Sequence, residues 1–282
     1  MAHGVLFVPE DWTALLADEM LAIRNQHRYF NEVHWRDIQG GHSSPQFLVA
    51  RDWLKHYLTV AMRGCPFKAF IAESGRHRSF PYPGEAGYPE HLLLSTKAAF
   101  KAGIAWSFYR ESKLRLNVVF DDTDSELERA VAAQLPDVLQ SECNTRRLES
   151  TRRYPWIRVS PVRFLPSDPK SVDSEAWPYT EFIQLCDLLL GASFQALRLT
   201  PEPKALGRRQ LARSIMEVLG ETLRVPWLQQ LRVHRRLSVS LYPDQHNFAY
   251  PAALRAVPSK PVMSNNYYLP GFEEAAMAGT PS

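Results

Sequence analysis

The chain has 282 residues, 45% of them hydrophobic and 11% aromatic, which is enough apolar material for one large core or two small ones. Lys and Arg number 33 against 30 Asp and Glu, and the resulting net charge of +3 by itself neither marks nor excludes a nucleic-acid-binding protein. The three cysteines, Cys65, Cys143 and Cys186, have no CxxC or Cys/His spacing, so a disulfide framework or a zinc site is not expected and a reducing, cytoplasmic compartment fits best.

The N-terminal quarter predicts two strands and two helices. Val5–Val8 is a short apolar run typical of a strand, and it lacks the cationic region and long apolar stretch of a signal peptide. A helix follows to about residue 25, and Phe30–Trp35 is expected to be a short extended segment. Apolar residues recur at helical spacing over Pro45–Met62, and Phe67–Ala72 alternates like a strand. No apolar run anywhere is long enough to predict a membrane span.

The middle of the chain contains the clearest strand signal. After a Pro- and Gly-rich loop, Gly75–Gly87, a helix is expected over about Glu90–Arg110. Apolar residues then alternate over Leu114–Phe120 and lead directly into Asp121 and Asp122.

A further helix and strand are expected after this pair of aspartates. Thr123 with Glu126, and Ser125 with Glu128, both have the spacing of a capping box, which predicts that a helix begins here. Trp156–Phe164 reads as one more strand.

The last third predicts two helices and a tail. Pro178–Leu197 is almost wholly apolar, so this helix is expected to be buried nearly all round, whereas Arg208–Leu223 is amphipathic. The tail after Pro251 is rich in Pro, Ser and Asn and is expected to be loosely ordered. Strands that alternate with helices favour an α/β fold, with a main domain over residues 1–200 and a helical extension and tail over residues 201–282.

Asp187 is the most informative candidate residue because it lies inside the apolar helix. A buried carboxylate must be compensated by a cation, a metal ion or several hydrogen bonds, or its pKa must rise until it is neutral. The alternative to a functional role is an ion pair with a buried arginine or the capping of a neighbouring loop, and burial alone favours that alternative.

Asp121 and Asp122 are candidates because of their place at the end of a strand. Ligands of open α/β sheets usually bind outside the carboxyl ends of the strands, which favours a functional role. The alternative is that Asp122 or Thr123 only caps the next helix, and both roles can hold at once.

Glu32 is the third candidate, in a Glu-x-His pattern that places Glu32 and His34 on the same face of an extended segment. Alone, this pattern is more typical of a solvated edge strand than of a site. Three carboxylates on three separate elements are nevertheless what a two-metal nuclease requires, because its Mg²⁺ ions are bound by several converging acidic side chains.

Several stretches in the order described resemble the domain of unknown function 3800 family, whose members are similar to ribonuclease H in fold. The stretch that matches best is Ile183–Leu188, which is similar to the family's Gln-Leu-Ala-Asp-Leu motif with Cys186 in the Ala position. The other stretches are Gly4–Trp12, Glu32–Trp35 and Val118–Asp122. The resemblance covers about residues 4 to 197 and implies a mixed sheet flanked by helices.

The resemblance also implies a chemistry. Family members open with a strand that ends in Asp-Glu-Ser-Gly, and its Asp is expected to be a metal ligand; this chain begins at what resembles the second strand, so the first strand is expected to be missing. Ala72–Gly75 has Ala in place of that Asp. The implied function is phosphodiester hydrolysis in nucleic acid with Mg²⁺ or Mn²⁺, in which Glu32, Asp121 and Asp187 are ligands and Asp122 is a substitute.

Two rival functions remain open at this stage. A catalytically inactive ribonuclease H-like module that binds nucleic acid or a partner protein is favoured by the missing Asp, whereas a hydrolase that uses Ser or Cys finds little support because Cys186 lies in an apolar helix. A free sheet edge would allow pairing with a partner protein or a second copy of the chain. An arginine-rich stretch could bind the phosphates of a nucleic acid, or could only keep a loop soluble. Its arginines are Arg146, Arg147, Arg152, Arg153 and Arg158. The same two interpretations apply to His234–Arg236.

Overall fold

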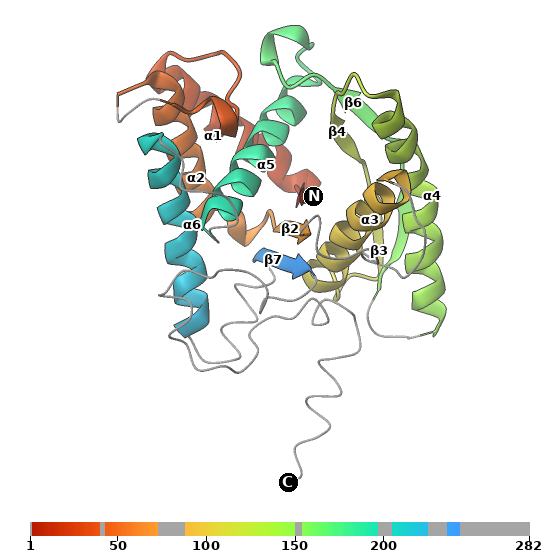
Figure 1. The fold of residues 1–282 in the computed structure, drawn as a ribbon. Coiled ribbons are helices and arrows are strands. Elements are labelled where there is room, and N and C mark those ends of the chain that lie inside the picture. The colour runs from red at the N-terminus through yellow and green to blue at the C-terminus, as the bar shows by residue number, and fades with distance from the viewer. Residues whose placement is uncertain are drawn as a thin grey trace.

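The computed structural model describes residues 2–39, 43–72, 88–149, 154–196, 205–224 and 236–242, and in them the chain has a mixed α/β fold (Figure 1). The loop expected over residues 75–87, the tail after Pro251, Arg152 and Arg153 lie outside the described residues. No helix in the described ranges is both long and apolar enough to cross a membrane.

One three-stranded sheet lies in the middle of the molecule. Its order is β1 (Ala2–Leu6), β2 (Phe67–Ala72) and β7 (Leu237–Tyr242), with β1 antiparallel and β7 parallel to β2. The strand β7 was not predicted from the sequence. The stretch 201–282, expected as a helical extension, therefore also contributes a strand to this sheet.

Two pairs of parallel strands form the second set. In these pairs β3 (Lys113–Leu116) lies beside β5 (Trp156–Val159), and β4 (Val119–Asp121) lies beside β6 (Arg163–Leu165). The prediction of one continuous strand over Leu114–Phe120 and another over Trp156–Phe164 was wrong, because each is divided in two.

The division between these strand pairs has a physical cause. Pro161 has no N–H to donate at the position where the ladder breaks. At the same position the hydroxyl of Ser160 donates a hydrogen bond of 2.9 Å to the side chain of Asn117. The ladder resumes where the N–H of Arg163 donates to the carbonyl of Val118, at 3.0 Å.

Four helices pack with one face of the central sheet to form the first core. They are α1 (Glu10–His27), α2 (Pro45–Thr59), α5 (Trp177–Ala196) and α6 (Leu206–Arg224). Pro45 occupies the first turn of α2, and the Ser44 hydroxyl accepts a hydrogen bond from the N–H of Phe47 at 3.2 Å, which is the usual way to cap a helix. The predicted helices therefore exist close to their expected bounds.

The second core lies on the other face, under α3 (Tyr88–Ser107) and α4 (Glu126–Glu149). Val5 of β1 and Phe7, just after that strand, contribute to it, so the central sheet separates two cores, as the composition allowed. The predicted cap of α4 is present: the Ser125 hydroxyl accepts a hydrogen bond of 3.3 Å from the N–H of Glu128.

The predicted extended segment Phe30–Trp35 is not a strand. It is irregular and ends in the short 3₁₀ helix η1 (Trp35–Asp37). Side chains from α1 and α5 bind its backbone groups in place of a neighbouring strand: Arg24 donates to its carbonyls, and Gln184 accepts from the N–H of Val33 at 2.7 Å. The remaining short 3₁₀ helices are η2 (Ala61–Arg63) and η3 (Pro169–Ser171).

A glycine allows η1 to lie against α5. A Cβ atom at Gly191 would lie 2.2 Å from Cγ of the Trp35 indole, which is far closer than van der Waals contact permits. The helix therefore needs a residue without a side chain at this position.

We predict that Gly191→Ala destabilises the protein by about 1–3 kcal/mol, because the methyl group must push the indole of Trp35 away. This loss should exceed the gain that Ala brings to a helix interior. The free energy of unfolding in urea measures the effect, with Gln26→Ala, on the exposed face of α1, as a control that should change it by at most about 0.5 kcal/mol. A Gly191→Ala variant as stable as the unaltered chain would contradict the close approach.

Candidate functional site

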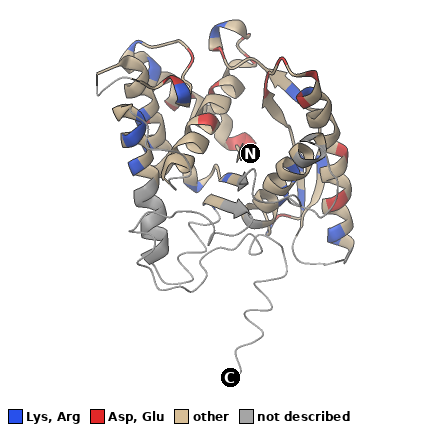
Figure 2. Ribbon diagram, in the orientation of Figure 1, with Lys and Arg blue, Asp and Glu red and all other residues tan. Residues whose placement is uncertain are grey.

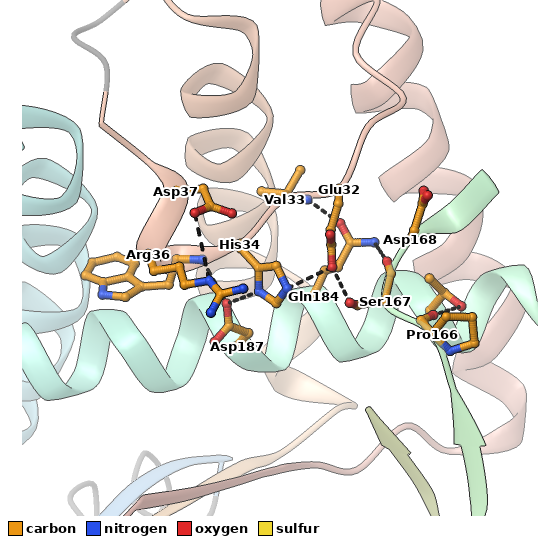
Figure 3. Close-up of polar contacts among 12 residues, drawn as sticks. Glu32, Val33, His34, Arg36, Asp37, Pro166, Ser167, Asp168, Gln184 and Asp187 are labelled. Atoms are coloured by element: carbon orange, nitrogen blue, oxygen red, sulfur yellow. Dashed lines mark hydrogen bonds and ion pairs between the residues drawn. The ribbon is translucent and has the colours of Figure 1, made fainter. Parts of the chain in front are cut away.

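Four separate segments bring polar side chains together beside the middle of α5, and Figure 3 shows the side chains from three of them. Glu32 and His34 come from the irregular segment after α1, and Ser167 follows β6. Asp121 is the last residue of β4, and Asp187 lies in the middle of α5. We call these five residues the carboxylate cluster.

His34 lies between two of the three carboxylates. Its Nε2 is 2.7 Å from Oε1 of Glu32, and its Nδ1 is 3.1 Å from Oδ2 of Asp187. Both ring nitrogens can donate only when the imidazole is protonated, so the arrangement favours an imidazolium ion. Oδ2 of Asp187 also accepts a hydrogen bond of 2.8 Å from the N–H of Trp35.

The electrostatics of the cluster agree with this geometry. The hydrogen bond to Asp187 raises the pKa of His34, and the negative charges of Asp187, Glu32 and Asp121 raise it further, against the opposing effect of burial. His34 is therefore the cation that compensates a group of acidic side chains.

Asp121 joins the cluster through Ser167. Burial raises the pKa of Asp121, as do the charges of Glu32 and Asp187, whereas His34 and a hydrogen bond with Ser167 lower it. The same Ser167 hydroxyl is placed to donate to Oε1 of Glu32, so its single proton is shared between the two carboxylates. The structure thus brings together Glu32, Asp121 and Asp187, the three residues that were predicted from separate elements.

Asp187 is not the deeply buried carboxylate that the apolar sequence of α5 predicted. Its side chain keeps 37% of its exposure, because α5 presents this face toward the strand ends and not toward the core. The buried carboxylate of the helix is Glu181, whose side chain is fully buried and whose Oε2 lies 2.8 Å from Nε of Arg24. The expected pairing with a buried arginine exists, but at an earlier position of the helix.

Arg24 and Gln184 hold the segments that carry the cluster. The guanidinium of Arg24 donates to the carbonyls of Tyr29 and Asn31, at 3.0 and 2.7 Å, and to Oε1 of Gln184 at 3.0 Å. The Gln184 amide in turn donates to the carbonyl of Ser167 at 2.7 Å. Sequence reasoning missed both residues, although an arginine among the apolar positions of α1 was a possible signal.

Asp122 is not brought into the cluster. Its Oδ1 lies 2.5 Å from Nη2 of Arg129 in α4, and the Arg129 Nε donates to the carbonyl of Thr123 at 2.7 Å. Asp122 therefore helps to fix the start of α4, which agrees with the alternative of a structural role.

The carboxylate cluster contains ligands of the kind that a hard cation such as Mg²⁺ prefers, because three carboxylates and a hydroxyl supply oxygen atoms. As they are placed, however, no three His, Cys, Asp or Glu side chains in the described part of the chain converge on a point where a metal ion would fit. The His34 ring separates the Glu32 and Asp187 oxygens. A metal ion held by both carboxylates requires His34 to release at least one of them.

Comparison of the chain with protein-family models, with curated proteins and with solved structures finds no match in any of the three. The interpretation of the cluster therefore depends on its own geometry.

We predict that Arg24→Met destabilises the protein by about 3–5 kcal/mol, because Glu181 would then be a buried charge without a partner. Adding Glu181→Gln to this variant should recover part of the loss, since no buried charge then remains. Arg51→Met is the matched control: Arg51 pairs with Asp52 in a half-exposed position, where an ion pair contributes at most about 1 kcal/mol. Equal losses from Arg24→Met and Arg51→Met in urea unfolding would contradict the buried network.

We also predict a pH-dependent contribution from His34. Because its pKa is raised in the folded state, the stabilisation it supplies is fully present below its ordinary pKa of 6.5 and is lost as the pH rises through the raised value. The difference in unfolding free energy between the unaltered chain and His34→Gln should therefore be largest below pH 6.5 and shrink as the pH rises above it. A difference that grows over this range would show that the two carboxylates do not stabilise the imidazolium.

Proposed function

We propose that the protein is a metal-dependent nuclease-like enzyme that hydrolyses phosphodiester bonds in nucleic acid, with a ribonuclease H-like arrangement of its site. The observation that carries the proposal is the meeting of Glu32, Asp121 and Asp187 around one imidazolium. These carboxylates come from three elements, and burial, together with the charges of Glu32 and Asp187, raises the pKa of Asp121. Such a concentration of negative charge is expected where a cation is to bind.

Mg²⁺ or Mn²⁺ would be held by Glu32, Asp121 and Asp187. When bound, the ion would supply Lewis-acid activation of a water molecule and of the scissile phosphate. The chain's own groups orient these ligands: Ser167 donates to Glu32, and the N–H of Trp35 donates to Asp187. His34 fixes the direction of both carboxylates and holds a proton beside them.

The fold supports this proposal in outline. Asp121 lies at the carboxyl end of β4, which pairs in parallel with β6, and ligands of α/β proteins bind at such ends. The same site is the part of the chain that resembles the domain of unknown function 3800 family. Nucleic acid is the proposed partner, and a second copy of the chain or a partner protein remains a further proposal for the outer edge of β1, which among the described strands pairs only with β2.

A second candidate function is an inactive ribonuclease H-like module that binds nucleic acid or a partner protein. The observation that favours it is that His34 already satisfies both Glu32 and Asp187. In the described ranges no three-ligand metal group exists without a rearrangement of this histidine. In this case the carboxylates would be held for structural reasons alone.

We predict Mn²⁺-dependent cleavage of labelled single- or double-stranded DNA or RNA, and a loss of about 100-fold or more in rate for Asp187→Asn, because a ligand of the ion is removed. Asp37→Asn is the matched control, since Asp37 is an exposed carboxylate near the cluster that pairs with Arg36 at 3.9 Å. Heat released on titration with Mn²⁺ measures metal binding independently. Absence of metal-dependent cleavage, or equal cleavage by Asp187→Asn, would leave the binding module as the better proposal.

A further inference from the structure

The outer face of the β3–β5 strand pair exposes three basic side chains and an indole. Lys113, Arg115, Trp156 and Arg158 all point away from the second core, because the alternate residues of both strands face it. The indole of Trp156 is 41% exposed, which is unusual for so large an apolar group. Figure 2 shows basic positions on the strands of this half of the molecule. We call these four residues the β3–β5 surface.

The register of the two strands places like charges next to each other. Arg115 lies directly opposite Arg158, and Lys113 lies opposite Trp156. Neighbouring strands are only about 5 Å apart, so the two guanidinium groups repel each other at this position. No residue in the described ranges forms an ion pair with them. Two arginines held next to each other on an exposed surface point to a ligand with negative charge.

The chemistry of the surface selects one kind of ligand. Guanidinium groups bind phosphate oxygens in pairs, and an exposed indole offers a flat apolar face on which a base can stack. Bases inside a duplex are already stacked on each other, so they do not reach an indole on a flat sheet. A single strand presents both its phosphates and its base faces.

The β3–β5 surface is connected to the carboxylate cluster along the chain. The strand β3 leads through residues 117 and 118 into β4, which ends at Asp121, so Arg115 and Asp121 are about 20 Å apart along the chain. Arg163 of β6 is exposed between them, with its guanidinium 5.6 Å from the ring centre of Tyr179. An extended strand bound at Arg115 and Arg158 would pass this arginine on its way to the cluster.

We propose that the β3–β5 surface binds single-stranded nucleic acid, with a base stacked on Trp156 and phosphates held by Arg115 and Arg158, and directs the strand toward the carboxylate cluster. This inference rests on the proposed action on nucleic acid for its direction, but the binding itself does not require cleavage. It names a single strand, and not a duplex, as the substrate class.

Binding to the full chain is tested by fluorescence anisotropy with labelled oligo-dT and oligo-rU of about 12 nucleotides, in EDTA so that no metal-dependent cleavage occurs. The double variant Arg115→Gln/Arg158→Gln should bind at least about tenfold more weakly, with a salt slope lower by about 0.7 for each phosphate group that the variant no longer binds. Trp156→Ala should weaken binding by about tenfold, whereas Trp156→Phe should retain most of it because a ring remains for stacking. Circular dichroism checks that each variant is folded.

The matched control is Lys55→Gln/Arg213→Gln, which removes the same charge from exposed positions on α2 and α6. An equal loss in this control, unaltered binding by Trp156→Ala, or a duplex bound as tightly as the single strand would overturn the inference. Binding that depends on the surface in a protein that never cleaves would support the surface and remove the nuclease proposal. Cleavage that is unaffected by the surface variants would do the reverse.

Discussion

The buried ion pair between Arg24 and Glu181 is the interaction on which the candidate site depends. Neither side chain has appreciable access to water, so each charge is tolerated only because the other is present. The remaining donors of Arg24 then hold the carbonyls of Tyr29 and Asn31 and the amide of Gln184. An irregular segment that would otherwise be mobile is therefore fixed beside α5, with Glu32 and His34 at its end.

Because this segment is fixed, the position of the His34 ring is fixed as well. A histidine on a free loop could contact solvent or either carboxylate, but the His34 ring is held with one nitrogen toward Glu32 and the other toward Asp187. The imidazolium offsets part of the repulsion among three acidic side chains. A metal ion at this site would have to compete with the ring for the same oxygens, and that competition would distinguish the proposed nuclease from the proposed inactive module.

The sequence predicted the helices well because their signals are local. The capping residues before α4 and the apolar spacing of α2 act within a few turns, and both helices begin near their expected positions. It failed where the decisive contacts are distant in sequence. The segment around Val33 alternates like a strand, but its backbone partner is the side chain of Gln184, 151 residues away. The three carboxylates were predicted as a set, whereas the expected burial of Asp187 was wrong because periodicity does not show which face of an apolar helix meets a strand end.

Gln184 also connects the two halves of the molecule. Its carbonyl oxygen accepts from the segment packed on the first core, and its amide group donates to the carbonyl of Ser167, which follows β6, the strand that pairs with β4 beside the second core. Glu32 and Asp121 reach the same hydroxyl from these two sides. Any movement between the cores would therefore change the spacing of the carboxylates before it changed either core. A strand of nucleic acid that contacts β3 and β5 on one side and the cluster on the other would bridge the same boundary, so binding and the geometry of the site are expected to be coupled.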